Sequence, residues 1–198
     1  SSSKAELILS LVDKSQTISA EDKITIAVIR QLIEEIQQIK NHINEMEELI
    51  SEQLAESDTH LRTMPGVGDV IAASILSRVG SILSFSSASK LARHAGIAPE
   101  DYSSGATTKQ RRSKSGDRQL NAAIHRIALN QIGITKNGDP KCPVAHKYYQ
   151  RKISEGKSKL SALTCLKRRI CDIIYAMLRD KSKYLEQKPK KNLKAKVA

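Results

Sequence analysis

Residues 29–50 read IRQLIEEIQQIKNHINEMEELI, and their apolar positions alternate steps of three and four along the chain. This spacing is the a/d seam of a coiled coil, with β-branched Ile at every a position. No Gly or Pro interrupts residues 20–56, so we predict one long helix there and a coiled-coil stalk over residues 20–57. The seam consists of Ile29, Leu32, Ile36, Ile39, Ile43, Met46 and Ile50.

The partner of this predicted stalk is left open by its sequence. A long amphipathic helix could instead pack on its own domain. Three sustained heptads favour a coiled coil, formed either between chains or with a second helix of an antiparallel hairpin. Of these arrangements we expect a homodimer or a higher oligomer.

The composition outside the stalk also favours helices. Phe85 is the only Phe among 198 residues, Trp is absent and Tyr occurs five times. β-Sandwiches and barrels draw on aromatic and β-branched residues, whereas Leu, Ile and Ala suit helices that pack on helices. We therefore predict an all-α fold in which a compact helical domain, residues 58–187, follows the stalk. Residues 1–19 and the Lys-rich residues 188–198 are expected to be poorly ordered ends.

Hydrophobic periodicity divides the predicted domain into short helices. The polar and basic stretch 99–115, rich in Gly, Ser and Thr, is expected to be an exposed loop or an irregular hairpin. Helices are expected near residues 70–79, 90–96, 117–130, 144–151 and 158–178.

The charge is distributed unevenly along the chain. Residues 1–60 carry 5 Lys and Arg against 12 Asp and Glu, a net charge of −7, whereas residues 61–198 carry 28 against 9, a net charge of +19. A field of that size attracts polyanions, so the second part is the candidate for binding nucleic acid. The alternatives are a role in solubility alone or contact with an anionic membrane surface.

The sequence contains no signal for export, membrane insertion or metal binding. No apolar run approaches 18 residues, so we expect a cytoplasmic protein without a membrane partner. The three cysteines, Cys142, Cys165 and Cys171, form no CxxC pair and are expected to be reduced and inert. The histidines show no paired spacing, which predicts no metal site.

The sharpest local motif is LRTMPGVGDVIAASIL, residues 61–76. An apolar residue, then Pro-Gly-apolar-Gly, then a helix with small and apolar residues is typical of a helix-hairpin-helix, which we place at about residues 61–80. Gly66 and Gly68 permit the tight turn and place backbone N–H groups where a phosphate oxygen could bind. A purely structural turn between two helices is the alternative.

A second motif places serines inside a cationic loop. Ser103 and Ser104 precede Gly105, and a series of basic residues follows within thirteen positions. Cations there could bind a phosphodiester and stabilise charge on its oxygens, and a serine hydroxyl could attack phosphorus. By itself, a Ser-Gly pair in a loop is most often only a turn. The candidate phosphate-binding residues of this loop are Lys109, Arg111, Arg112, Lys114 and Arg118.

A third cluster combines aromatic and basic residues, which suits backbone contacts and base stacking. A Tyr nucleophile has to be considered for Tyr148, Tyr149 or Tyr175. For the first two we favour stacking or packing, and for Tyr175 a place in the core of the last helix. The candidate nucleic-acid-binding residues here are Arg151, Lys152, Lys157, Lys167 and Arg168.

In their order along the chain, these motifs resemble the IS110 class of insertion-sequence transposases, which includes the pilin-gene invertase Piv. The similarity runs from Leu61 to about Leu178, and the stalk matches the position of a coiled coil in that family. The ordered motifs are Met64–Gly68, Phe85–Ala92, Ala95–Pro99, Ser104-Gly105, Ser113–Asp117 and the stretch Tyr149–Lys157.

The resemblance implies a serine nucleophile at Ser104, with the adjacent Ser103 as the alternative. Family members place a RuvC-like domain with four acidic metal ligands before the coiled coil, so Mg²⁺ is expected only with that domain and no cofactor is expected in this chain. In some members a structured guide RNA selects the DNA.

One departure from the family concerns the N-terminus. About 19 residues precede the stalk, too few for a RuvC-like domain, so we expect a fragment, a truncated product or a stand-alone remnant. Such a chain should bind nucleic acid but cleave it poorly or not at all.

Three functions follow from these observations. The chain is predicted to be the DNA-binding C-terminal part of a transposase or site-specific recombinase. The alternatives are a non-catalytic module for nucleic-acid binding and dimerisation, or a helix-hairpin-helix DNA repair factor. The repair factor ranks last because it leaves the Ser-Gly loop and the basic helices without a role.

Overall fold

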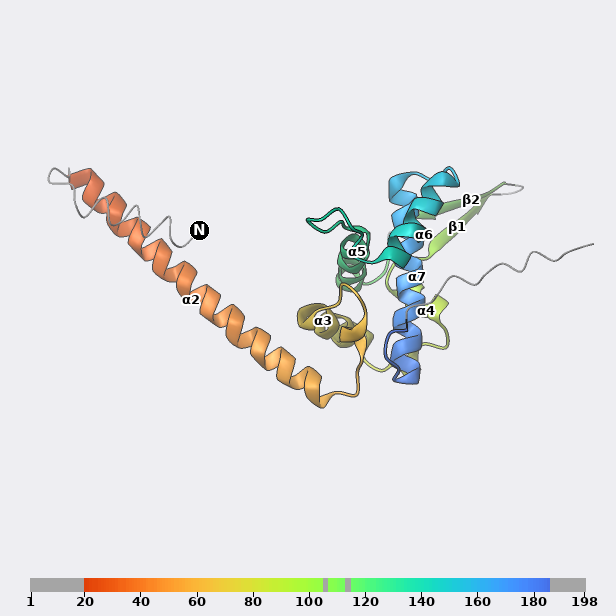
Figure 1. Ribbon diagram of the computed structural model, residues 1–198, viewed down its shortest axis with the longest axis horizontal. Helices are drawn as coiled ribbons and strands as arrows, with labels where there is room; N and C mark the ends of the chain where they lie inside the picture. The colour runs from red at the N-terminus through yellow and green to blue at the C-terminus, as the bar shows by residue number, and fades with distance from the viewer. Residues whose placement is uncertain (1–19, 105–106, 113–114, 186–198) are drawn as a thin grey trace, which may run out of the picture. The chain divides into compact units, whose positions relative to one another are not determined.

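The computed structural model describes the backbone of residues 20–104, 107–112 and 115–185, and the side chains of residues 22–98 and 115–185. It confirms the predicted helical fold, with one short β-hairpin within residues 99–112 (Figure 1). The predicted ends at 1–19 and 188–198 lie outside the described residues. In chain order the elements are α2 (Ala20–Glu56), η1 (Leu61–Thr63), α3 (Asp69–Val79), η2 (Ile82–Ser84), α4 (Ala88–His94), β1 (Pro99–Ser104), β2 (Thr107–Arg112), α5 (Arg118–Ile132), α6 (Pro143–Ser154) and α7 (Lys159–Asp180).

Helix α2 has the bounds that the heptad pattern predicts, Ala20–Glu56. The chain forms two compact units, Ser1–Leu49 and Ile50–Ala198, so most of α2 belongs to the first unit and its last residues to the second. Leu54 is buried and Ile50 packs against the core of the second unit. The end of the predicted stalk is therefore part of the helical body, because its apolar side chains reach that core.

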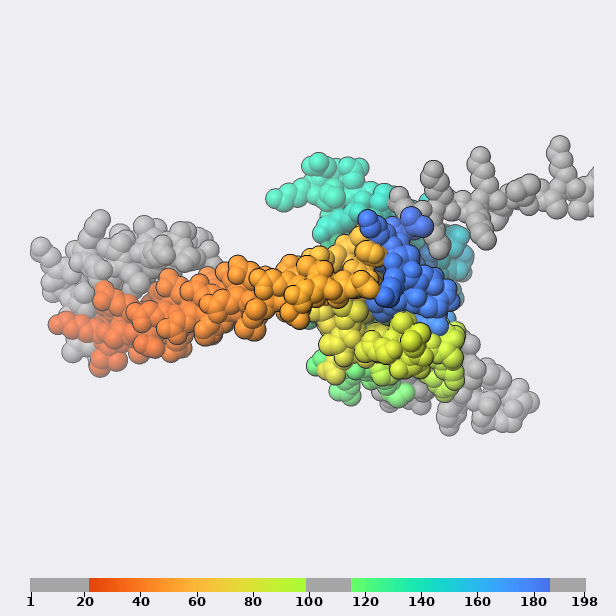
Figure 2. Space-filling model, turned by 90° about the horizontal axis from the view of Figure 1, so that it is seen from below, coloured from red at the N-terminus to blue at the C-terminus, as the bar shows by residue number. Residues whose placement is uncertain are grey.

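The body, residues 50–185, is built around α7. The buried residues of this helix recur at steps of three and four, which places them on one face. Helices α4, α5 and α6 each pack against α7, and Figure 2 shows the yellow-green segment that contains α4 lying beside the blue α7. Burying a Leu or Ile completely contributes about 1.5–3 kcal/mol, so this face organises the core. The largest of its fully buried side chains are Leu166, Ile170 and Ile174.

Side-chain caps set the beginnings of three helices in the body. Asp117 accepts a hydrogen bond from the Leu120 amide at 2.8 Å and begins α5, and Ser158 accepts one from the Ser161 amide at 3.2 Å and begins α7. Ser87 accepts a hydrogen bond from the Lys90 amide and begins α4. Each such cap contributes about 1 kcal/mol by satisfying an N–H group that the helix leaves unpaired.

The predicted helix-hairpin-helix is not confirmed in that form. Its first helix is only the single 3-10 turn η1, and its second helix is α3. Between them the chain turns at Gly66, whose φ of +86° favours glycine. Leu61, Met64 and Val67 are all buried, so the apolar positions of the motif anchor the turn in the core.

The basic stretch 99–115, expected to be a loop or an irregular hairpin, contains a regular one. Strands β1 and β2 pair antiparallel from Pro99 opposite Arg112 to Ser104 opposite Thr107. The hairpin leaves the body directly after α4 and returns directly before α5. The two ends of the hairpin are therefore joined to helices of the body.

The structure describes the cysteines and Tyr175, about which the sequence makes predictions. Cys142, Cys165 and Cys171 are free thiols, and burial raises the pKa of the Cys171 thiol to about 12, which keeps it protonated and inert. Tyr175 is buried, as predicted, and its hydroxyl donates to the Phe85 carbonyl at 3.1 Å. In the described residues no helix is long and apolar enough to cross a membrane.

Candidate nucleic-acid interface

Tyr148 of α6 is surrounded by positive charge. The guanidinium carbons of Arg151 and Arg169 lie 5.2 Å and 5.1 Å from the centre of its ring, and the Lys152 ammonium lies 5.7 Å from it. Arg169 belongs to α7 and the others to α6, so helix packing assembles the group from two segments. Proteins that bind single-stranded nucleic acid combine basic groups that follow the backbone with aromatic side chains on which bases stack, and this cluster contains both types of residue.

Glu155, at the end of α6, competes for these cations. It forms ion pairs with Lys152 at 2.6 Å and with Arg151 at 3.5 Å. The hydrogen bond from Lys152 holds the pKa of Glu155 below its usual range, and the same bond raises the pKa of Lys152. Both side chains therefore stay charged at neutral pH, and a phosphate would have to displace this carboxylate from the cations.

The backbone register of the hairpin separates the two candidate nucleophiles. Ser104 is opposite Thr107, and Ser103 is opposite Thr108. Because alternate positions of a strand share a face, Ser104 shares a face with positions 109 and 111, whereas Ser103 shares one with positions 110 and 112. Lys109 and Arg111 thus belong to the Ser104 face and Arg112 to the other.

Of the predicted phosphate-binding residues near the hairpin, Arg118 is described by the structure and Lys114 is not. Arg118 is exposed at the first position of α5, directly after the hairpin. Lys114 lies outside the described residues. Glu100 is directly opposite Arg111 in the register, which places an acid next to a predicted phosphate contact.

The base of the hairpin is clamped by two glycines. A Cβ at Gly116 would lie 2.5 Å from the Gly96 amide nitrogen and 2.8 Å from the His94 carbonyl oxygen, and both glycines have positive φ. Only glycine fits at these positions, because any side chain would force apart the two segments that flank the hairpin. The Asp117 amide then donates to the His94 carbonyl at 2.7 Å, which closes the base.

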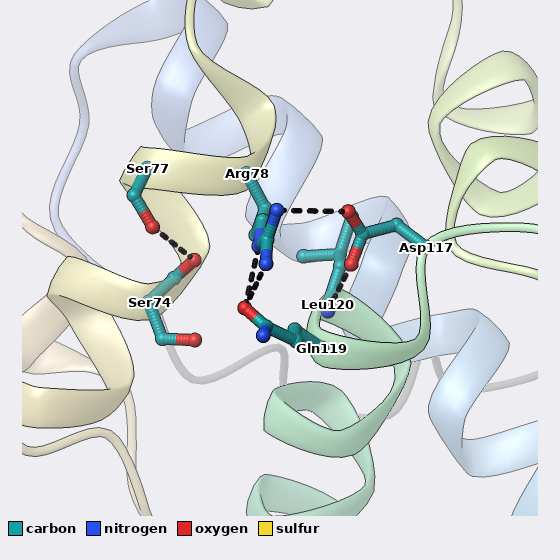
Figure 3. A network of polar contacts seen from close by, with 6 residues as sticks. All are labelled: Ser74, Ser77, Arg78, Asp117, Gln119 and Leu120. Atoms are coloured by element: carbon teal, nitrogen blue, oxygen red, sulfur yellow. Dashed lines mark hydrogen bonds and ion pairs between the residues drawn. The ribbon is translucent and has the colours of Figure 1, made fainter.

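Helix α3 braces the same region (Figure 3). Arg78 lies 3.8 Å from the Asp117 carboxylate, and its Nε donates to Gln119 Oε1 at 2.7 Å. Asp117 uses its other oxygen to cap α5 through the Leu120 amide. The exit of the hairpin is therefore tied to two helices.

Lys167 requires a correction. Lys167 is predicted from the sequence to bind nucleic acid, but only 6% of it is exposed and its ammonium donates to Asn121 Oδ1 at 2.5 Å. Position 167 falls on the core face of α7. The helix period could have indicated that this position is buried, but the charge of a lysine predicts exposure. We therefore remove Lys167 from the candidate nucleic-acid surface.

Arg168 also has structural partners. Its guanidinium donates to the Ala88 carbonyl at 3.2 Å and to Ser89 Oγ at 2.9 Å, and it pairs with Asp172 at 2.9 Å. These bonds fasten α7 to the start of α4. Arg151, Lys152 and the exposed Lys157 remain from that cluster as candidate contacts.

The two glycines of the Met64–Gly68 turn do not behave alike. A Cβ at Gly66 would lie 3.2 Å from Asn130 Cβ, so Gly66 lets the turn approach α5 closely. Gly68 has open space around it and caps the start of α3. Asp69 and Arg62 form an ion pair beside that helix end, at 3.2 Å, and this carboxylate opposes an incoming phosphate.

The sequence reasoning missed two residues that the structure brings to the site. Arg169 belongs to the basic run 167–169 of the third cluster but was not among the predicted contacts, although its place on the Tyr148 side of α7 follows from the helix period once α6 is known to pack there. Asn121 had no signal in the sequence, because its importance depends on contacts across 26 and 46 residues. In the described part of the chain, no group of three or more His, Cys, Asp or Glu side chains could hold a metal ion.

The chain is similar to proteins of insertion elements. Residues 58–150 match the family described as "Transposase IS116/IS110/IS902 family". The IS110 insertion-element protein of Streptomyces coelicolor is 37% identical over 130 residues, which cover 65% of this chain and 30% of the relative. The IS900 insertion-element protein of Mycobacterium paratuberculosis is 29% identical over 184 residues, 91% of this chain and 44% of the relative.

A gene-inverting protein is also similar to this chain. The pilin gene-inverting protein of Moraxella bovis is 31% identical over 121 residues, which cover 60% of this chain and 36% of that protein. The chain therefore spans less than half the length of each of these relatives.

Proposed function

Because the chain belongs to the IS116/IS110/IS902 family of transposases, we propose that it is the DNA-recombining part of a transposase or site-specific recombinase, with Ser104 as its nucleophile. The observation that carries the proposal is the register of the β1–β2 hairpin. It groups the Ser104 position with those of Lys109 and Arg111 on one face, and the hairpin base is clamped to the helical body.

The charge distribution supports Ser104 over Ser103. Two cationic positions on the same face can bind the non-bridging oxygens of a phosphodiester and stabilise the charge that develops on them during attack. The Ser103 face carries one such position, Arg112. A serine position that shares its face with two cationic positions is the better-placed nucleophile.

The proposed reaction is a transesterification. The Ser104 oxygen bonds to phosphorus, one P–O bond of the DNA strand breaks, and the departing DNA hydroxyl takes up a proton while the serine loses one. Because serine and not water attacks the phosphodiester, the phosphoester bond is conserved in the protein–DNA ester. A second DNA hydroxyl can then attack this ester, which rejoins the strand and releases the serine.

The cations around Tyr148, together with Lys157 and Arg118, are proposed to hold the DNA backbone. They are sequence-independent contacts, so binding should weaken steeply as salt increases. A structured RNA offers the same phosphates. Competition between DNA and RNA for the chain at fixed salt tests whether a guide RNA uses this surface.

Two parts of the proposal concern groups beyond the helical body. The exposed heptad seam of α2 is proposed to pair with a second copy of the chain. Mg²⁺ is assigned to a RuvC-like domain of the kind the family resemblance implies, and no step above depends on a metal held by this chain.

The test is capture of a covalent adduct on a suicide DNA substrate, whose cleaved strand loses a short end and cannot be rejoined. We expect Ser104→Ala in the adduct-forming protein to abolish the adduct and to leave DNA affinity unchanged. Ser103→Ala is the matched control, one position away on the other face of the hairpin, and should retain the adduct.

The opposite results from the two serine variants would move the nucleophile to Ser103. An adduct that survives both substitutions would exclude the serine mechanism. Salt-sensitive DNA binding without any adduct in the wild-type protein would favour the second candidate function, a non-catalytic nucleic-acid-binding module, which needs only the cationic surface.

A further inference from the structure

A line of polar contacts runs from the core face of α7 to the entrance of the hairpin. The Lys167 ammonium donates to Asn121 Oδ1 at 2.5 Å. The Asn121 amide nitrogen in turn lies 2.7 Å from the Ala95 carbonyl oxygen and 3.3 Å from that of Gly96. These carbonyls belong to the short segment that joins α4 to β1.

The same contacts reach the exit of the hairpin. Gly96 is in close contact with Ser115 and Gly116, and the Asp117 amide donates to the His94 carbonyl. Asn121 lies one helical turn after Asp117 on α5, so a single turn of α5 touches both ends of the hairpin. The entry and exit therefore cannot shift independently of Asn121.

The lysine in this line is costly for a core position. Only 6% of the residue is exposed, and replacing a buried charged group by an apolar side chain of similar volume is often neutral or stabilising. The neighbouring core residues of α7 are Leu166 and Ile170, so an apolar residue would suit position 167 for packing alone. A buried polar chain of this kind instead fixes the orientation of the groups it bonds.

We propose that Lys167 and Asn121 are positioning residues for the serine attack: they set the angle at which the β1–β2 hairpin leaves the body and so place Ser104 against the DNA phosphate. The inference rests on the proposed function. It assigns the orientation of the hairpin to buried residues, whereas the cationic surface residues only bind the DNA backbone.

The geometry of the hairpin makes its tip sensitive to its base. Ser104 is five residues from Pro99, about 16 Å along an extended strand. A tilt of about 10° at the base displaces a point at that distance by about 3 Å, and misplacement by about 1 Å can cost roughly a hundredfold in rate. A small change in the bonds of Asn121 should therefore lower the rate of attack without altering the DNA-binding surface.

The experiment measures the rate of adduct formation at increasing DNA concentration in the protein that forms the adduct. We expect Lys167→Met and Asn121→Ala each to lower the maximal rate by about a hundredfold. The DNA concentration at half-maximal rate should stay unchanged. The double variant should be no slower than either single one, because both residues act through one chain of contacts.

Lys90→Met is the matched control. Lys90 is exposed on α4, and its loss removes the same single charge without touching Asn121, so the maximal rate should stay within about twofold of wild type. Hydrogen exchange of the Asp117 amide, which reports opening of the hairpin base, should accelerate in Lys167→Met and Asn121→Ala and not in the control. If Lys167→Met does not fold, Asn121→Ala decides the question, since alanine is compatible with α5.

Maximal rates close to the control, in a protein whose adduct depends on Ser104, would overturn the positioning role and leave the serine mechanism intact. A changed half-maximal DNA concentration with an unchanged maximal rate would also overturn it. An adduct that persists in both serine variants would remove the proposed function and this inference together.

Discussion

The stalk and the helical body use the same apolar residues in opposite ways. In α2, Ile36 and Ile43 are 51% and 50% exposed, although they sit in a regular heptad seam. In the body, Ile75 and Ile124 are completely buried. A periodic pattern in the sequence thus states which face of a helix is apolar, but it does not state whether the same chain supplies the covering surface.

The two regions also differ in charge. Residues 1–60 carry a net charge of −7 and residues 61–198 a net charge of +19. An acidic helix is repelled by a phosphate backbone, whereas the body attracts one. In the proposed function, association with another helix falls to the stalk and nucleic-acid binding to the body, and the two proposals can be tested separately.

The largest effect is expected from charges placed in the stalk seam. Ile36→Asp combined with Ile43→Asp should raise the dimer dissociation constant at least about a thousandfold, because each carboxylate would be buried without a partner. The body should unfold at an unchanged temperature. Sedimentation over a range of concentrations measures the first quantity and circular dichroism the second.

The control for the seam variant adds the same charges off the seam. Gln37→Asp combined with Asn44→Asp has the same spacing of seven residues, and both positions are exposed. This variant should associate like the wild type. Equal association of the two double variants would show that the seam has no partner helix and would remove the main contrast between stalk and body.

A smaller effect is expected from the core of the body. Ile124→Ala should lower the free energy of unfolding by about 2–5 kcal/mol, since it removes a fully buried side chain from α5 and leaves a cavity. Ile134→Ala, at a position that is 58% exposed, should change it by less than about 0.5 kcal/mol. Urea unfolding at two protein concentrations checks both values, and the loss should not depend on concentration.

The smallest effect concerns pH. Partial burial raises the pKa of Asp172 from its ordinary value of 3.8, and the Arg168 guanidinium opposes that rise only in part. The folded state therefore binds a proton more tightly than the unfolded state, so the contribution of Asp172 to stability is largest below pH 3.8 and is lost as the pH rises through its folded-state pKa.

Asp172→Asn removes this titration. The free energy of unfolding of the wild type minus that of the variant should decrease as the pH rises from below 3.8, and then level off. Urea unfolding at a series of pH values measures the difference. A difference that instead grows with pH would mean that the ion pair with Arg168 outweighs the burial of the carboxyl.

Local patterns predicted much of the fold. The bounds of α2 followed from heptad spacing and the absence of Gly and Pro, and the expected helix 117–130 corresponds to α5, which Asp117 caps. The predicted first helix of the Met64–Gly68 motif is only a 3-10 turn, because Leu61 and Met64 are drawn into the core within a few residues. The regular pairing of residues 99–112 was also beyond reach, since polar strands show no apolar alternation.

The candidate site was predicted less completely than the fold. Basic residues near one another in sequence suggested a surface, and Arg151 and Lys152 do lie against Tyr148. Lys167 looked identical to them in the sequence, but it faces the core and bonds Asn121. Charge reports what a residue can bind, whereas its burial depends on which helix face the rest of the chain covers.

The amino-acid sequence by itself determined that this chain is helical, that its first helix carries an apolar seam, and that its charge is concentrated in the second part, because periodicity and charge are properties of neighbouring residues. Only the tertiary structure decided which lysines and arginines are available to a ligand and which glycines clamp the hairpin. Those outcomes depend on contacts between residues far apart in the chain, such as Gly66 with Asn130 and Asn121 with Lys167, and no local pattern encodes them.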